Sequence, residues 1–316
     1  MRLSRAIRQY VAMKQVMGKP FDQGTKVLQA FCIHVGDVSL RSVAKWQVLG
    51  FLERSALSDV TWLLRHRLLK AFFEYWMARD ELKGLPIPPS RHPSTARTFV
   101  PYIYSVSELR QLLNEAGLKR APKSREFGPL TFQTILLFLY GTGARINETL
   151  CLRSNDVDLK HGTVAFRQLT ANKTRIVPIG PHLRQSLRAY LDSLEPSGSD
   201  RTNFFVRKNG RPIQPVDLCR SFRTLRRKAG ISRPAGISRQ PRVQDLRRTF
   251  AVHCMRAWLR RGKDLRSMLP ILGAYLGHVS LASTEAYLAV TPERFLTQLS
   301  SLSSVGKRSV VTSTLE

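Results

Sequence analysis

Residues Gln244-Asp-Leu-Arg-Arg-Thr-Phe-Ala251 are followed by Leu276-Gly-His-Val-Ser280 and then by Ser283-Thr-Glu-Ala-Tyr-Leu288. Much earlier in the chain, Tyr140-Gly-Thr-Gly-Ala-Arg145 places an arginine directly after a glycine-rich turn, at a predicted helix start. Backbone donors and the helix dipole at such a position favour a phosphate. Attack on a phosphodiester without a metal needs cationic groups for the non-bridging oxygens, a nucleophile and an acid. These segments supply candidates for most of those roles.

In this order the segments closely resemble the signature of the tyrosine recombinases, the phage integrase-like enzymes. The resemblance is strong over residues 105–299 and rests on helical pattern alone before them. It implies that Arg145 and Arg247 clamp the scissile phosphate and that His278 hydrogen-bonds it. It also implies that Tyr287 is the nucleophile, which becomes covalently joined to a DNA 3′-phosphate.

Two further site residues are predicted, Lys173 and Glu148. The segments 162–166 and 175–179 predict two strands and a turn, with Lys173 near the tip. Lys173 matches the lysine that acts in this family as general acid for the departing 5′-oxygen, although Arg175 and Lys160 lie nearby. Glu148, three residues after Arg145, is expected to orient that guanidinium.

Gln244 departs from the family pattern, which usually has histidine three residues before the second arginine. Glutamine can hydrogen-bond but cannot carry a proton between groups. Gln244 and Arg247 still lie one helical turn apart, so we expect Gln244 to contact the phosphate. His253 lies well off that face, at about 100° per residue, and is not expected to substitute. We expect a competent but slow site.

The charge of the chain indicates a polyanionic partner. Lys and Arg number 51 against 22 Asp and Glu, a net charge of +29. Nucleic acid is the leading candidate, with anionic lipid or an unspecific basic surface as alternatives. The charge alone does not separate DNA from RNA, and the resemblance implies double-stranded DNA. The longest apolar runs, such as 135–140, are too short to span a membrane, and no secretion signal is visible. We expect a cytoplasmic, nucleoid-associated protein.

The four cysteines lack CxxC spacing, so neither a zinc site nor a disulfide framework is expected. The resemblance likewise implies no metal and no nucleotide cofactor.

The helical patterns and a composition shift divide the chain. Helices expected at 3–17, 25–35, 40–54 and 60–82 form a helical core-binding domain over 1–84. A proline-rich linker over 85–104 precedes a catalytic domain over 105–299 and a flexible C-terminal tail over 300–316. The expected fold is mainly α with a small β-hairpin, the two domains forming a clamp on DNA.

Two basic helices are predicted to contact the DNA backbone. In 60–82 the packing set is Leu64, Leu68, Phe72 and Trp76, and the phosphate-facing set is Arg65, Arg67 and Lys70. In 216–229 the packing set is Leu218, Phe222, Leu225 and Ala229, and the phosphate-facing set is Arg220, Arg223 and Arg227. For any single charge, an ordinary solvated face is the alternative.

The resemblance implies site-specific recombination that integrates or excises a mobile element, by four protomers on two DNA sites, with accessory recombinases as further partners. A long stretch between Arg247 and His278 is similar to transposon-borne members. Phe295, Leu296 and Leu299 fit a segment, 291–299, that docks onto a neighbouring protomer or packs on its own domain. The alternative functions are a type IB topoisomerase-like enzyme that relaxes DNA, and a catalytically impaired DNA-binding relative.

Overall fold

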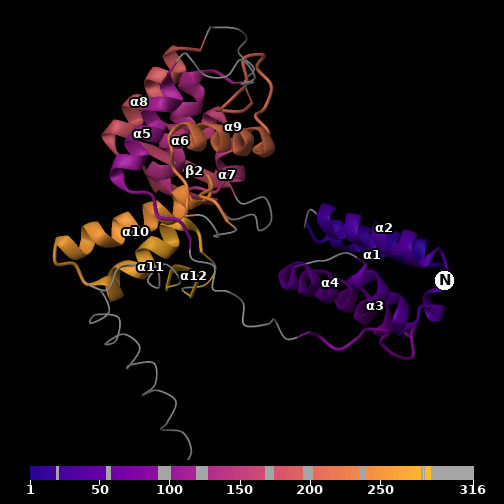
Figure 1. Cartoon of the computed structure of the whole chain (residues 1–316). Coiled ribbons are helices and arrows are strands. Elements are labelled where there is room, and N and C mark those ends of the chain that lie inside the picture. The colour runs from indigo at the N-terminus through magenta and orange to yellow at the C-terminus, as the bar shows by residue number, and fades with distance from the viewer. Residues whose placement is uncertain are drawn as a thin grey trace, which may run out of the picture. The chain divides into compact units, whose positions relative to one another are not determined.

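The computed structural model describes residues 1–18, 21–54, 58–91, 101–118, 127–167, 174–194, 202–234, 239–278, 280 and 282–285. The chain divides into two compact units (Figure 1). The first lies within Met1–Phe99, and the second begins at Val100. Both are mainly helical, with a small sheet in the second, so the predicted fold class is confirmed. No helix among the described residues is long and apolar enough to cross a membrane.

The first unit is a helical bundle. Its helices are α1 (Leu3–Val16), α2 (Asp22–Val35), α3 (Lys45–Glu53) and α4 (Asp59–Met77), with a 3₁₀ turn, η1, at Leu40–Ser42. The single helix expected over 40–54 is therefore wrong: extended backbone at Val43 and Ala44 separates η1 from α3. Tyr10, Phe31 and Phe72 are among the buried rings that fill the core.

Helix α4 buries part of the predicted stripe, because Phe72 and Trp76 are buried as predicted. Trp62, His66 and Leu69 are buried, whereas Leu64 is 61% exposed, so the packing role predicted for Leu64 is wrong. The chain beyond α4 stays on this unit, because Leu85 and Ile87 pack against its core. The Pro88 carbonyl also lies 2.8 Å from Nε2 of His66.

The second unit contains the remaining elements. The helices are α5 (Val106–Gly117), α6 (Pro129–Thr142), α7 (Ile146–Leu150), α8 (Pro181–Asp192), α9 (Pro215–Lys228), α10 (Asp245–Arg260), α11 (Leu265–Leu276) and α12 (Ala282–Glu285). A 3₁₀ turn, η2 (Ser154–Asp156), precedes the sheet. A capping box begins α5: Oγ of Ser105 accepts from the Glu108 amide, and the Glu108 carboxylate accepts from the Ser105 amide.

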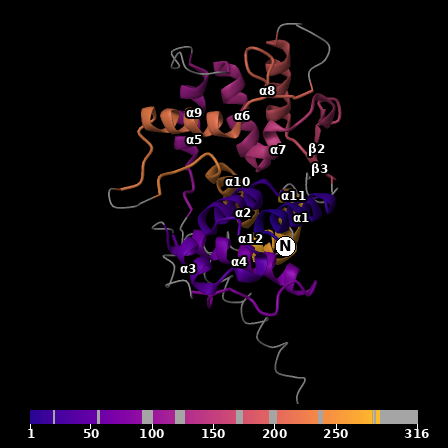
Figure 2. The ribbon, with the colours of Figure 1, turned by 90° about the vertical axis from the view of Figure 1, so that its right-hand side faces the viewer.

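An antiparallel sheet in the order β1-β2-β3 is formed by β1 (Val157–Asp158), β2 (Thr163–Arg167) and β3 (Thr174–Pro178). Ala165 pairs with Ile176 in the β2–β3 register. The views in Figures 1 and 2 place this hairpin beside α7.

Helix α6 is central to the core. Its side chains are apolar on nearly all sides, and Phe132, Ile135 and Phe138 are buried. A second cluster joins α10 to α11. The C-terminal ends of α6 and α11 and the N-terminal ends of α7 and α10 thereby meet, and the candidate site lies where they do.

Candidate active site

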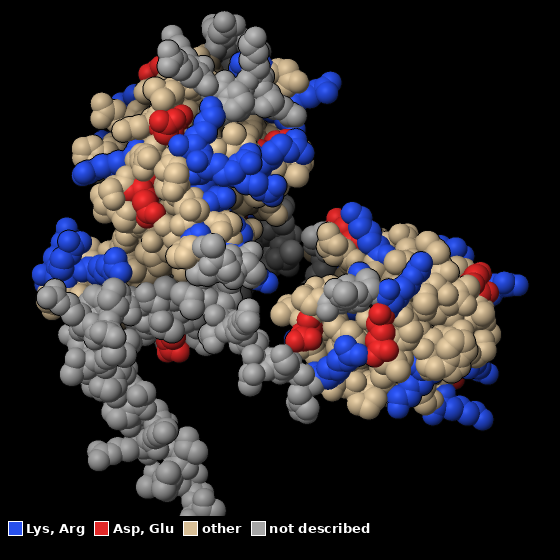
Figure 3. All heavy atoms as spheres, viewed as in Figure 1, with Lys and Arg blue, Asp and Glu red and all other residues tan. Residues whose placement is uncertain are grey.

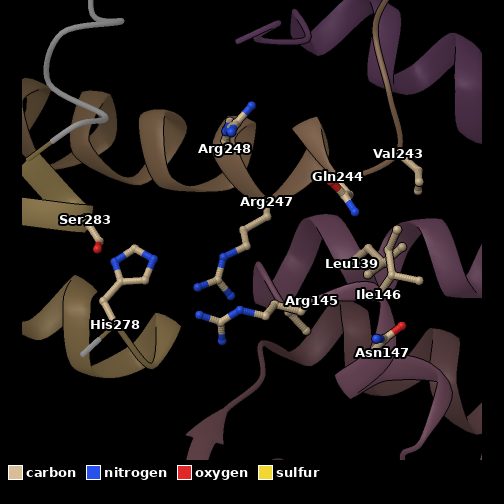
Figure 4. A pocket seen from close by; sticks show the side chains of 11 residues that line it. Leu139, Arg145, Ile146, Asn147, Val243, Gln244, Arg247, Arg248, His278 and Ser283 are labelled. Atoms are coloured by element: carbon tan, nitrogen blue, oxygen red, sulfur yellow. The ribbon is translucent and has the colours of Figure 1, made fainter. Parts of the chain in front are cut away.

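A pocket of about 460 Å³ opens between these helix ends. Its lining includes Arg145, Gln244, Arg247, His278 and Ser283. In Figure 4 the guanidinium groups of Arg145 and Arg247 and the imidazole of His278 point toward one another, while Arg248 points away. Four of the predicted site residues, from α7, α10 and the turn after α11, are therefore brought together.

The position of Arg145 follows from the turn between α6 and α7. Gly143 ends α6 in the left-handed conformation, with φ of 61°, and Arg145 is the N-cap of α7. The Glu148 carboxylate accepts from the Arg145 backbone amide at 2.9 Å and from its Nη1 at 2.9 Å. The predicted orienting contact from Glu148 is thus present in the structure.

Arg247 is held by backbone carbonyls. Its Nη1 donates to the Gly143 carbonyl at 2.7 Å and its Nη2 to the Leu276 carbonyl at 2.9 Å. These carbonyls lie at the C-terminal ends of α6 and α11, where the helix dipole favours a cation. The guanidinium is therefore seated between two helix ends, facing the pocket.

His278 follows the turn that ends α11. Gly277 adopts the left-handed conformation with φ of 70°, and the His278 amide donates to the Gly273 carbonyl at 2.9 Å. The Nδ1 atom lies 2.7 Å from Oγ1 of Thr284, a fully buried residue of α12. The opposite side of the ring faces the two guanidinium groups (Figure 4).

The electrostatic surroundings keep His278 neutral. Burial lowers the pKa of its imidazole to about 4, and the charges of Arg247, Arg145 and Arg175 act in the same direction. At neutral pH the ring therefore carries one proton and can donate one hydrogen bond and accept another. This suits a hydrogen bond to a phosphate better than an ion pair.

Glu148 is shared with a second arginine. Arg175 of β3 donates from Nη1 and Nη2 to the two carboxylate oxygens at 3.0 and 2.9 Å. Burial acts to raise the pKa of Glu148, but the hydrogen bonds and charges of Arg175 and Arg145 outweigh it and lower the pKa to about 2. The carboxylate is therefore ionised at any physiological pH.

Gln244 occupies the N-cap position of α10 and lines the pocket, one turn before Arg247. It also lines a neighbouring pocket of about 440 Å³, together with Arg223 and Arg242. His253 lies elsewhere, as predicted, with Nδ1 3.0 Å from the Tyr140 hydroxyl.

Lys173 and Tyr287, and the segment 291–299, lie outside the described residues. Thr174, the first residue of β3, follows Lys173 directly, and α12 ends two residues before Tyr287. The predicted tail over 300–316 is outside the described part as well.

The predicted backbone-binding arginines and lysine fall on exposed helix faces, apart from Arg65, which is partly buried over the Phe51 ring. In the first unit, Nζ of Lys70 lies 3.6 Å from Oε1 of Glu74. In the second, Leu218, Phe222, Leu225 and Ala229 of α9 are buried as predicted. The opposite face of α9 exposes Arg220, Arg223 and Arg227. Figure 3 shows Lys and Arg side chains gathered over this part of the second unit.

Sequence reasoning missed two contacts of the site, those of Arg175 and of Thr284. From the sequence, Arg175 is only a neighbour of Lys173. The alternation of the strand indicates that Arg175 faces the core, because Arg175 lies on the same face as the buried Val177. Thr284 stands in the Ser283-Thr-Glu-Ala-Tyr287 segment, but nothing in that segment alone indicates a partner six residues earlier.

Two guanidinium groups, a neutral imidazole and an amide line one pocket of a mainly helical unit, and groups of these kinds can hold a phosphodiester. The family model described as "Phage integrase family" matches residues 107–294, more than half of the chain. The chain belongs to the phage integrase family, the tyrosine recombinases.

Individual relatives agree with this assignment. The chain is 30% identical over 247 residues to the tyrosine recombinase XerC of Staphylococcus haemolyticus, covering 78% of this chain and 76% of that protein. It is 29% identical over 258 residues to the tyrosine recombinase XerA of Thermococcus kodakarensis, covering 82% and 80%.

Solved structures share the fold. The Tn1549 transposon integrase in complex with a circular intermediate DNA superposes with a TM-score of 0.68 at 16% identity, covering 96% of this chain and 99% of that one. A lambda integrase tetramer bound to a Holliday junction gives a TM-score of 0.64 at 14% identity, covering 89% and 78%.

Proposed function

We propose that this protein carries out site-specific recombination of duplex DNA, integrating or excising a mobile element, through a 3′-phosphotyrosine intermediate at Tyr287. The observation that carries the proposal is the convergence of Arg145, Arg247 and His278 on one pocket (Figure 4). Membership of the tyrosine recombinase family supports it.

Arg145 and Arg247 hold the non-bridging oxygens of the scissile phosphate and stabilise the charge that grows on them in the transition state. His278 and Gln244 add neutral hydrogen bonds to the same group. Glu148 does not bind the phosphate itself and instead orients Arg145.

Cleavage is a transesterification. The phenolic oxygen of Tyr287 loses its proton to water, because Gln244 cannot accept it, and forms a bond to phosphorus while the bond from phosphorus to the 5′-oxygen breaks. Lys173 donates a proton to the departing 5′-oxygen, leaving a free 5′-hydroxyl. Attack by a 5′-hydroxyl of the partner strand reverses the chemistry, so the bond energy is kept and neither a metal nor a nucleotide is consumed.

Both units bind the same DNA duplex. Arg65, Arg67 and Lys70 contact the DNA backbone from the first unit, and Arg220, Arg223 and Arg227 from the second. Two recombining duplexes have four strands to cut, and each protomer supplies one Tyr287, so the synaptic complex is a homotetramer. The lambda integrase tetramer on a Holliday junction supports this stoichiometry. Such a protein works on DNA in the cytoplasm, at the nucleoid.

The test uses nicked suicide substrates that carry candidate sites from the ends of the protein's own genetic element. Denaturing electrophoresis then detects covalent protein–DNA adducts. We expect an adduct with the native sequence and none with Tyr287→Phe, which retains the ring but lacks the attacking oxygen.

The alternatives give different results. Specific binding without an adduct, not restored by Gln244→His, indicates a catalytically impaired DNA-binding relative. Catalytic relaxation of any supercoiled plasmid, irrespective of sequence, indicates a type IB topoisomerase-like enzyme.

A further inference from the structure

Arg175 makes an unusually complete set of contacts for a strand residue. Both terminal nitrogens donate to the Glu148 carboxylate, and Nε donates to the Tyr275 carbonyl at 3.1 Å. The guanidinium also lies over the Phe166 ring, 4.6 Å from its centroid. The side chain is only 14% exposed, so every one of these contacts is made away from bulk water.

The Glu148 carboxylate links Arg175 to Arg145. Oε1 accepts from Nη1 of both arginines, and Oε2 accepts from the Arg145 amide and from Nη2 of Arg175. A bidentate arginine fixes the plane of a carboxylate as well as its place. The orientation of Arg145, whose side chain is 47% exposed, therefore depends on a carboxylate that Arg175 holds.

Arg175 also packs against the turn that leads to His278. A Cβ atom on Gly277 would lie 2.9 Å from Nη1 of Arg175, so the turn and the guanidinium are in close contact. The same residue thus contacts the supports of two phosphate-binding groups that come from α7 and from the end of α11.

We propose that Arg175 is a positioning residue for DNA cleavage, acting through Glu148 to hold the Arg145 guanidinium on the scissile phosphate. The inference rests on the proposed function. It assigns Arg175 to the phosphate clamp rather than to the general acid Lys173, from which it is separated by only one residue in sequence.

A matched control lies on the neighbouring strand. Arg167 of β2 also pairs with a buried carboxylate, that of Asp156, with Nε and Nη2 each 2.8 Å from Oδ1. This ion pair joins the same hairpin to η2, and neither Arg167 nor Asp156 lines the pocket. Arg167→Ala therefore reports what losing a hairpin ion pair does to the scaffold.

The experiment measures single-turnover cleavage of three suicide substrates by Arg175→Ala, Arg175→Lys, Arg167→Ala, Arg145→Ala and Lys173→Ala. One substrate has an ordinary phosphate, one a neutral methylphosphonate, and one a sulfur in place of the 5′-oxygen. The methylphosphonate removes the charge that the arginines stabilise. The sulfur leaves as a thiolate, so it has little need of a general acid.

Arg175→Ala should slow cleavage of the ordinary substrate by about 10- to 100-fold. The defect should shrink on the methylphosphonate, as for Arg145→Ala, and persist on the sulfur substrate. Arg175→Lys should recover little, because lysine cannot make the bidentate contact. Recovery on the sulfur substrate, as for Lys173→Ala, would place Arg175 with the general acid and overturn the proposal. An equal defect in Arg167→Ala on all three substrates would reduce Arg175 to a scaffold residue.

A DNA-free measurement separates this inference from the proposed function. In ¹⁵N spectra of the protein alone, Arg175→Ala should increase the mobility of the Arg145 Nε–H group, and Arg167→Ala should not. Unchanged Arg145 mobility overturns the positioning role even if the chain cleaves no DNA. Absence of any Tyr287-dependent adduct with the native sequence counts against the proposed function alone.

Discussion

The hydrogen bond between Thr284 and His278 makes the role of α12 testable. Thr284→Val replaces the hydroxyl with a methyl of nearly the same size, so the buried site keeps its packing and loses only its polar contact. The 2.7 Å contact to Nδ1 disappears, and that nitrogen is left without the hydroxyl. A lost hydrogen bond with one buried partner left behind costs about 1–2 kcal/mol.

The loss affects the orientation of the imidazole, because the hydrogen bond at Nδ1 holds the ring with its other side toward the phosphate. If the whole cost is expressed in the transition state, cleavage should slow by about 5- to 30-fold. The assay is single-turnover cleavage of a suicide substrate at saturating protein. Thr284→Ser is the control, since it retains the hydroxyl and removes only a methyl group.

We expect Thr284→Ser to cleave within about threefold of the native rate, less than the loss of one hydrogen bond would cause. Equal rates for Thr284→Val and the native protein would refute the reasoning, since His278 would then not need the hydroxyl. A larger defect in Thr284→Ser than in Thr284→Val would refute it differently, by showing that packing rather than hydrogen bonding matters.

Three more expectations follow from the site. Gly143→Ala should lower the free energy of unfolding in urea by more than about 2 kcal/mol and should slow cleavage. A left-handed alanine is strained, and its Cβ would lie 2.6 Å from the Phe250 ring. Gly210→Ala is the control, because it introduces the same backbone strain at a position with no neighbouring atom within 4 Å. Glu148→Gln should cost about 3 kcal/mol of stability near neutral pH. Because its folded-state pKa is lowered to about 2, that difference should narrow as pH falls below 4.5, and a pH-independent difference contradicts the ion-pair account. Gln244→His should speed cleavage by about tenfold or more, because histidine can accept a proton and glutamine cannot. The pH–rate profile should then gain a limb near the histidine pKa. An unchanged rate would mean that proton transfer to a base does not limit cleavage.

Much of the site could be predicted because its residues stand in short segments that resemble the family signature. Arg145 follows a glycine turn, Arg247 lies a fixed helical turn after Gln244, and His278 follows a helix-ending glycine. Such features are local, so a short segment of sequence is enough to place them.

Arg175 shows why other contacts could not be predicted. In Thr174-Arg-Ile-Val177 the alternation of a strand puts Arg175 on the same face as Val177 and leaves Ile176 on the other. The structure has this arrangement, with Val177 buried, Arg175 14% exposed and Ile176 70% exposed. The alternation does not indicate which group pairs with the arginine, because Glu148 lies 27 residues earlier in the sequence.

The error at Leu64 has a geometric cause. The predicted stripe advanced by four residues at each step, and each such step turns about 40° past a full helical turn. Over three steps the set spreads across a third of the helix surface. The buried residues of α4 are Trp62, His66, Leu69, Phe72, Phe73 and Trp76. Apart from Phe72, which lies beside Phe73, they follow alternating steps of four and three, and such steps keep to one face of the helix.

The seat of Arg247 has a consequence for any mutational survey. Two of its acceptors are the main-chain carbonyls of Gly143 and Leu276, and every amino acid carries such a carbonyl. An alanine scan of the surrounding residues would leave those two oxygens in place and would not measure their contribution. That contribution is measured when the path of the backbone changes, as with proline replacements at the ends of α6 and α11.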